Sequence, residues 1–328
     1  MTYQRALNAQ FLGDLKASQP EHRGWLAALL ARVKEDDTLM LALRGDYVNI
    51  YYRGGNLLKI AQNSGGNYLA TFDAKYNKTG HDLPTFPFSI VSAQDTVELI
   101  RHIPALKYTM DSYFSRHRKP EREFQQLVAR ENNCSPISNE TEYFIVDIEI
   151  AGALTKARFD MLGVRWLRNE RKKQNSLVPV LIEMKYGIEA LEGKSGLQEH
   201  LDDAHSISIE SWKSLFSDLE KQVNQLADLG LLEFNRSRPD ERLELDSAAT
   251  PELVFLLANY NPASTKLSRF LATLDVPTAS AEGKINYELL FSVASFAGYG
   301  LHRACMLSLA EFKALVEKLS AAARPKSK

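Results

Sequence analysis

Two charged residues on an otherwise apolar segment are the first sign of chemistry in this chain. The segment "VPVLIEMKYG" places Glu183 and Lys185 two residues apart, with Leu181, Ile182 and Met184 around them. If the segment is a β-strand, side chains two residues apart project to the same side. A carboxylate and an ammonium group on so apolar a strand are costly unless they are paired or bound to a metal ion. The pattern therefore predicts either a buried ion pair or a metal-dependent site.

A second carboxylate lies on the preceding predicted strand, "ARFDMLGV", where Asp160 is surrounded by apolar residues. If the two strands are neighbours, Asp160 can lie beside Glu183. Two carboxylates together with water and substrate phosphate suit Mg²⁺, a hard cation that prefers oxygen ligands, and Mn²⁺ is its expected substitute. Lys185 would then stand next to the metal-bound water or the scissile phosphate, where it could stabilise the charge that builds up there.

Other interpretations of these charges stay open. Asp147 and Glu149, in "FIVDIEIAG", also alternate correctly for one face of a strand and compete for the acidic role. They could also form a solvated strand edge, or contact the residues that bind the metal ion without binding the ion themselves. The residues Asp160, Glu183 and Lys185 could also form a buried ion-pair network without chemistry.

The elements around these residues follow a recognisable order. Residues 1 to about 35 have helical periodicity, and residues 38–72 contain three turn signals between β-rich runs, which predicts a β-meander. A helical stretch leads to Pro120. Residues 121–261 then read as a helix, three strands, a helix and a buried strand, followed by another helix, a strand and a last helix that starts at a Ser308/Glu311 capping box.

Asp160 followed by Glu183-Met184-Lys185 resembles the PD-(D/E)xK nuclease superfamily. The resemblance covers roughly residues 120–260, and the residue before Asp160 is Phe159 where the family motif has proline. It implies an α/β fold with a restriction-endonuclease-like αβββαβ core and a mixed sheet. We expect this nuclease domain over residues 116–328, preceded by an α+β region over residues 1–115 that contains the meander.

The superfamily often adds a glutamate from the first core helix. Phe124, Leu127 and Val128 predict the buried stripe of that helix, and Glu131 continues the stripe, so we choose Glu131 as an additional catalytic residue. Some relatives also use a polar residue on the helix after the E-x-K strand, for which Gln222 and Gln225 are the candidates.

Two basic clusters flank the predicted site in a chain whose net charge is only −1. Such clusters give salt-sensitive contacts to phosphates, although a solvated surface loop is the alternative. The residues chosen as nucleic-acid-binding are Arg118, Lys119, Arg168, Arg171, Lys172 and Lys173.

Several other functions find little support. "GIEALEGKSG" resembles a phosphate-binding loop, but its spacing is one residue too long and no helix is expected after Gly196. "HLDDAHS" (residues 200–206) is expected to be a polar loop, and the histidines show no zinc-type spacing. The two distant cysteines, the N-terminus without signal character and the lack of a long apolar run predict a cytoplasmic protein without membrane contact.

The sequence thus predicts a Mg²⁺-dependent endonuclease that hydrolyses DNA, with DNA favoured over RNA, acting in defence against foreign DNA or in repair. Asp160 and Glu183 would bind the metal ion, and Lys185 and Glu131 would assist. Such an enzyme could act as a homodimer, and a second protein could activate it. The alternatives are a non-catalytic module that binds nucleic acid or protein on the same fold, and an RNA nuclease.

Overall fold

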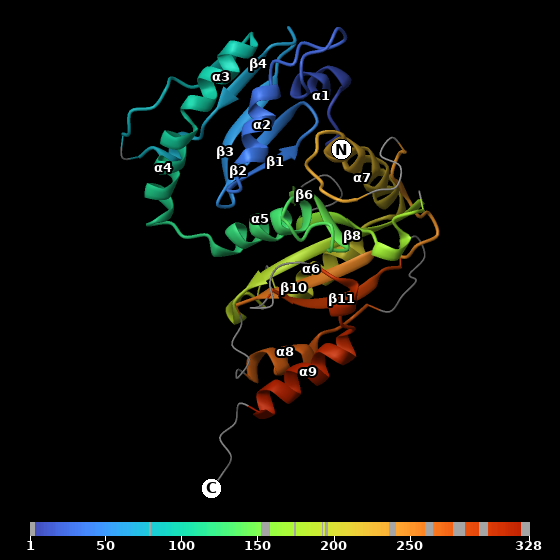
Figure 1. Ribbon diagram of the computed structural model, residues 1–328. Helices are drawn as coiled ribbons and strands as arrows, with labels where there is room; N and C mark the ends of the chain where they lie inside the picture. Colours follow the sequence, from blue (N-terminus) through green and yellow to red (C-terminus); the bar gives the residue numbers. More distant parts are fainter. Residues whose placement is uncertain are drawn as a thin grey trace. The chain divides into compact units, whose positions relative to one another are not determined.

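The computed structural model describes residues 4–78, 80–151, 158–173, 175–191, 193, 196–235, 241–259, 265–277, 286–294 and 301–322 (Figure 1). The chain divides into two compact units, each with its own sheet. The N-terminal unit comprises Gln4–Cys134 and Lys221–Glu233, and the C-terminal unit comprises the described residues of Ser135–Glu220 and Phe234–Lys328. The boundary that we expected after residue 115 falls inside the N-terminal unit.

The N-terminal unit is built on a five-stranded antiparallel sheet in the order β1-β2-β3-β4-β5, so the predicted β-meander is confirmed. Tight turns after β1 and β2 use glycines with positive φ, Gly45 and Gly54. The strands are β1 (Leu39–Leu43), β2 (Tyr47–Tyr52), β3 (Gly55–Gln62), β4 (Tyr68–Thr71) and β5 (Phe88–Ile90). The helices of the unit are α1 (Ala9–Leu15), α2 (Ala27–Glu35), α3 (Ala93–Arg101), α4 (Ile103–Phe114) and α5 (Pro120–Asn133), with a 3-10 turn at Ala74–Tyr76.

Helix α5 differs from its expected pattern. It buries a largely polar face, whereas Phe124, Leu127 and Glu131 are only half-buried. The amide of Gln126 explains this, because it donates to the carbonyls of Thr38 and Tyr51 and accepts from the Gly54 N–H at 2.7 Å. The buried residues of α5 are Gln125, Gln126, Val128, Ala129, Asn132 and Asn133. Of the predicted stripe Phe124, Leu127 and Val128, only Val128 is fully buried, so that stripe is confirmed in part.

The C-terminal unit is built on a mixed sheet in the order β11-β10-β8-β7-β6, with the short strand β9 beside β8. Strands β6 (Tyr143–Ala151), β7 (Arg158–Arg165) and β8 (Asn175–Tyr186) are antiparallel neighbours. Strands β10 (Glu252–Ala258) and β11 (Glu288–Ala294) run parallel to β8, and β9 (Glu244–Leu245) also pairs with β8 in parallel. The predicted α/β class is thus confirmed.

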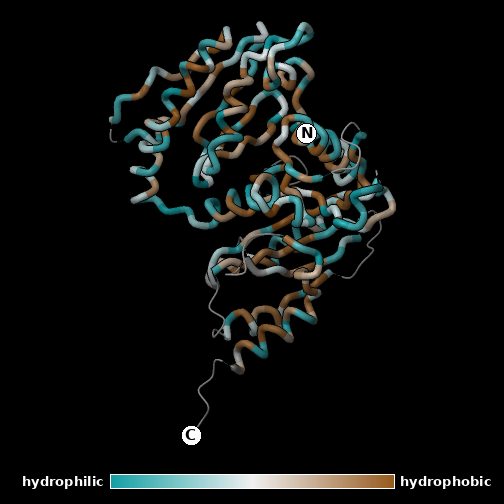
Figure 2. Tube along the Cα trace, in the orientation of Figure 1, coloured by the Kyte–Doolittle hydropathy of each residue, from teal (hydrophilic) through white to brown (hydrophobic). Residues whose placement is uncertain are grey.

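Helices connect the parallel strands, as parallel pairing requires. Helices α6 (Leu197–Ser206) and α7 (Ile209–Asp228) lie between β8 and β10, α8 (Thr265–Thr273) lies between β10 and β11, and α9 (Leu309–Ala322) follows. Further 3-10 turns span Arg168–Glu170, Ile188–Leu191 and Arg303–Cys305. Hydrophobic and hydrophilic stretches alternate along α8 and α9 (Figure 2), and the predicted capping box is confirmed because Glu311 N–H donates to Ser308 Oγ.

Strand β10 shows why the core lies at the centre of this sheet. All seven residues of "ELVFLLA" are buried, as expected for a parallel strand that is covered on both faces. Strand β8 is buried from Ser176 to Lys185, so its charged residues lie within the core and not on the surface. Only glycine fits at position 163 of β7, because a Cβ there would meet the Phe144 carbonyl oxygen at 2.4 Å.

Candidate active site

Asp160 and Glu183 meet where the β7–β8 ladder ends. The register of the two strands runs from Arg165–Val178 to Met161–Ile182. Immediately beyond it, the Asp160 N–H donates to Glu183 Oε2 at 3.3 Å, and the Met184 N–H donates to Asp160 Oδ2 at 2.9 Å. Each carboxylate therefore binds the backbone of the neighbouring strand, and the two acidic side chains lie together as predicted.

Glu183 and Lys185 form a buried ion pair. Glu183 is 2% exposed and Lys185 is 4% exposed, and Lys185 Nζ lies 2.6 Å from Glu183 Oε1. Their neighbours across the ladder on β10 are Phe255 and Leu257, which are apolar. The pair is therefore shielded from water. In the protein interior the electrostatic attraction between the two charges is stronger, but removing them from water is costly.

His200 is a member of this site that the sequence interpretation missed. Its Nε2 lies 2.8 Å from Glu183 Oε1 and 3.0 Å from Lys185 Nζ. The expected polar loop is instead helix α6, which starts directly after Gly196. Leu197, Leu201 and Ala204 form its buried face, and His200 shares that face because it follows Leu197 by three residues. That spacing was the available signal.

His200 and Lys185 both contact one oxygen, Glu183 Oε1. Two nitrogen neighbours fix the Glu183 carboxylate in one orientation. The other imidazole nitrogen, Nδ1, is buried and has no hydrogen-bond partner among the described residues.

The remaining acidic candidates occupy other positions. Glu131 lies on α5 in the N-terminal unit, whereas Asp160, Glu183 and Lys185 belong to the C-terminal unit. Asp147 on β6 is fully buried, and its Oδ1 accepts the Ile148 N–H at 2.7 Å. Glu149 adopts a positive φ of 55°, a conformation that is uncommon for a residue with a side chain. Asp147 is thus a buried group and not part of a solvated edge.

Asp160 and Glu183 are the two carboxylates of this site that could hold a divalent cation. Among the described residues, no group of three or more His, Cys, Asp and Glu side chains is placed to hold a metal ion. Mg²⁺ does not require three, because it commonly keeps several waters and uses one or two carboxylates with substrate phosphate. Lys185 at 2.6 Å and His200 at 2.8 Å from Glu183 Oε1 are the groups whose contacts would have to adjust.

The basic clusters divide into one half-buried member and several exposed members. Arg171 is directed into the protein, where it donates to the carbonyls of Asn139 and Thr141 and lies over the rings of Phe144 and Trp166. Its pKa is lowered, chiefly by burial. Arg171 is therefore a packing residue, which corrects its assignment to nucleic-acid binding. The exposed members are Arg118, Lys119, Arg168, Lys172 and Lys173.

A second buried carboxylate shows what a structural network looks like in this sheet. The side chain of Glu252 on β10 is fully buried, and it accepts from Tyr143 Oη at 2.8 Å and from Arg165 Nε at 2.6 Å. Both of its oxygens are thus satisfied by side chains of other strands. Burial and this carboxylate raise the pKa of Tyr143.

The phosphate-loop alternative meets a mixed result. A 3-10 turn at Ile188–Leu191 follows β8, and Lys194 and Ser195 lie outside the described residues. The expectation that no helix follows was wrong, because α6 begins at Leu197. Its first turn faces the sheet with buried Leu197, so it contributes packing at that position.

Of the Gln candidates, Gln225 is used within the N-terminal unit, where it bonds the Leu7 backbone at both N–H and C=O, each at 2.8 Å. Within the described part of the chain, no helix is long and apolar enough to cross a membrane. Comparison with known proteins gave no matching family model, no matching curated protein and no matching solved structure.

Proposed function

We propose that this protein is a metal-dependent phosphodiesterase that cleaves DNA, with its centre at Asp160, Glu183 and Lys185. The observation that carries the proposal is the buried Glu183–Lys185 pair beside Asp160 at the end of the β7–β8 ladder. A buried ion pair contributes little net stability compared with apolar residues of similar size. Chemistry is therefore a better reason than stability for charges at this position.

Each residue has a role that follows from its position. Asp160 and Glu183 would hold the metal ion, and a bound Mg²⁺ would supply Lewis-acid activation of water and charge neutralisation at the phosphate. Lys185 would contribute a positive charge beside the reacting phosphate. His200 would hold the Glu183 carboxylate in orientation through its 2.8 Å contact.

The topology supports the same proposal. Antiparallel β6, β7 and β8 are followed by α6 and α7 and then by β10 in parallel with β8. This order is similar to the three strands, helix and fourth strand of the restriction-endonuclease-like core. We propose that core for the C-terminal unit, with defence against foreign DNA or repair as the process that such an activity would serve. Cutting both strands would be served by a homodimer.

The test is cleavage of supercoiled plasmid, single-stranded DNA and RNA by the full chain with Mg²⁺, Mn²⁺ or EDTA. We expect metal-dependent cleavage of DNA that is lost in Asp160→Asn and in Lys185→Met. Tyr143→Phe, which alters the structural Glu252 network, is the matched control and should retain activity. Equal cleavage by wild type and both site variants would refute the assignment of these residues.

One observation favours a rival. Glu183 Oε1 is already engaged by both Lys185 and His200, as in an ion-pair core without catalysis. The chain would then be a non-catalytic module that binds nucleic acid or protein. No cleavage of any substrate, together with nucleic-acid binding that does not depend on metal ions, would favour this rival.

A further inference from the structure

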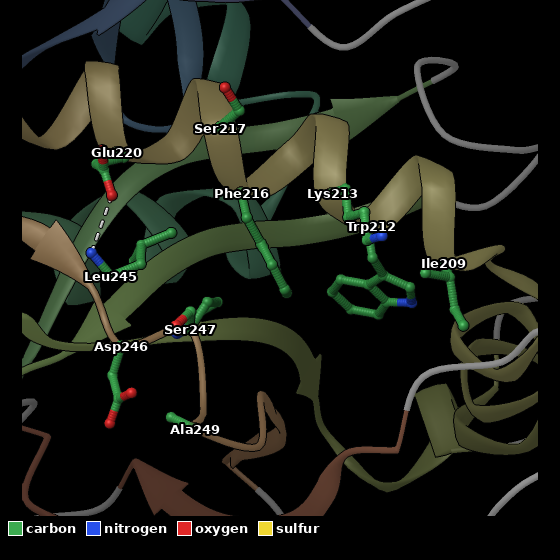
Figure 3. A pocket seen from close by; sticks show the side chains of 11 residues that line it. Ile209, Trp212, Lys213, Phe216, Ser217, Glu220, Leu245, Asp246, Ser247 and Ala249 are labelled. Atoms are coloured by element: carbon green, nitrogen blue, oxygen red, sulfur yellow. Dashed lines mark hydrogen bonds between the residues drawn. The ribbon is translucent and has the colours of Figure 1, made fainter.

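A cavity lies in the C-terminal unit, between helix α7 and the segment that follows β9 (Figure 3). Its volume is about 400 Å³, within the range of small-ligand sites. The side chains of Trp212 and Phe216 extend from α7 toward the segment that carries Ser247 and Ala249 (Figure 3), and Pro179 of β8 also lines the space.

The cavity has a structural cause in the strand pairing of β8. Strand β9 pairs with β8 up to Leu177, and β10 pairs with it from Val180 onward. Pro179 lies between these two partners and has no N–H to satisfy. The opposite wall is fixed, because the Leu245 N–H donates to Glu220 Oε2 at 3.0 Å. The space thus results from the change of partner along β8, from β9 to β10, and from the helix packed beside it.

The walls define the chemistry of an occupant. The rings of Trp212 and Phe216 lie 5.2 Å apart at 48° and present apolar surface. Trp212 is 2% exposed, and its indole N–H has no acceptor among the described residues. Lys213, also at the cavity, is exposed and forms no salt bridge within the described part of the chain. A planar ring with hydrogen-bond acceptors at its edge and an anionic group nearby would match the apolar rings, the indole N–H and the Lys213 ammonium group.

The cavity is also placed for the substrate of the proposed active site. Pro179 and Glu183 are four residues apart on β8, so they project to the same side at a separation of about 13 Å. That span is short enough for one nucleic-acid strand to cover, and Glu183 and Lys185, which are 2% and 4% exposed, would have to become accessible to its phosphate.

We propose that this cavity binds a nucleobase, unstacked from the strand whose phosphate lies at Glu183 and Lys185. The inference rests on the proposed function for its substrate. The base packs against Phe216 and Trp212, one of its carbonyl or ring-nitrogen acceptors takes the indole N–H, and the adjoining phosphate pairs with Lys213. Stacking of this kind is tolerant of sequence, so the cavity adds affinity for unpaired strands more than base specificity.

The test is binding of a short, labelled single-stranded DNA to the full chain in EDTA, followed by fluorescence anisotropy. Phe216→Ala should raise Kd by roughly fivefold to a hundredfold, since it removes a stacking surface. Trp212→Phe should raise it by about fivefold, since it removes the donor but keeps an aromatic ring. Trp166→Phe is the matched control, because Trp166 is equally buried in the same unit but donates to Ser176 Oγ.

A second probe separates the sources of the base. The same oligonucleotide with abasic sites should bind wild type as weakly as the intact one binds Phe216→Ala. Free deoxynucleoside monophosphates that bind wild type but not Phe216→Ala, without any effect of that variant on oligonucleotide binding, would assign the cavity to free nucleotides. Unchanged binding of both probes by a folded Phe216→Ala protein would overturn the proposal.

These measurements need no cleavage, so they fail independently of the phosphodiesterase. Base-dependent binding by a chain that cuts nothing would retain the cavity and reject the enzyme. Cleavage that Lys185→Met abolishes, with binding insensitive to Phe216→Ala, would retain the enzyme and reject the cavity.

Discussion

Replacing Lys185 alone should destabilise the protein more than replacing Glu183 and Lys185 together. Lys185→Met leaves a carboxylate that is 2% exposed without its closest partner, among the apolar neighbours Phe255 and Leu257. Breaking a buried ion pair in this way typically costs ~3–5 kcal/mol. Glu183 still has His200 at 2.8 Å, so we expect a loss near the lower end, about 3 kcal/mol.

The double variant Glu183→Met/Lys185→Met removes both charges and places two apolar side chains in an apolar part of the sheet. Its expected cost is about 1–2 kcal/mol, because the Asp160 N–H loses the Glu183 Oε2 acceptor at 3.3 Å and His200 Nε2 loses Glu183 Oε1 at 2.8 Å. A native domain has only about 5–15 kcal/mol of stability, so a difference of about 1–2 kcal/mol between the variants is readily measured.

The assay is urea unfolding followed by tryptophan fluorescence and circular dichroism, with nuclease activity measured on the same samples. Both variants should be inactive although the double variant is the more stable. If the double variant is destabilised as much as the single one, or more, the pair holds the fold together and the argument from buried charge to chemistry is refuted.

Three further outcomes are expected. His200→Ala should lower metal-dependent cleavage by about tenfold. His200→Gln should restore part of the activity, because the amide can again donate to Glu183. Equal activity of the two variants would contradict an orienting role for His200. Burial alone would raise the pKa of Asp36, but hydrogen bonds from Lys107 and Thr38 lower it to about 2. This carboxylate therefore stabilises the fold above about pH 4, and its contribution of about 2 kcal/mol is lost as the pH falls toward 2. Acid unfolding of Lys107→Met should lack this pH-dependent loss of stability. Arg171→Ala should lower the free energy of unfolding by about 2 kcal/mol. Arg168→Ala should leave the free energy of unfolding unchanged and reduce the salt dependence of DNA binding by about one ion. The reverse pattern would contradict the distinction between the two arginines.

Much of the local structure follows from the sequence. The glycine turns and β-rich runs of residues 38–72 specify a meander because tight hairpins need residues that accept positive φ. The Ser308/Glu311 box begins α9 because its side chains satisfy the free amides at the helix start. Two-residue alternation placed Glu183 and Lys185 on one side of β8, since that period is a property of every strand.

Long-range interactions were beyond local patterns. Helix α5 has its buried face set by Gln126, whose partners Thr38, Tyr51 and Gly54 lie far away in the sequence. Arg171 belongs to a charged run, yet its guanidinium finds carbonyl acceptors about thirty residues earlier in the chain. A charge pattern cannot distinguish a solvated side chain from one whose hydrogen bonds are supplied by distant backbone.

The sequence by itself determined which residues could do chemistry at the centre of the C-terminal unit, Asp160, Glu183 and Lys185, because strand periodicity and the cost of buried charge are local. Only the tertiary structure decided that His200 joins them and that Glu131 lies in the other unit. The physical reason is that His200 reaches Glu183 through the packing of α6 on the sheet. Packing depends on the shapes of surfaces that come together only after folding.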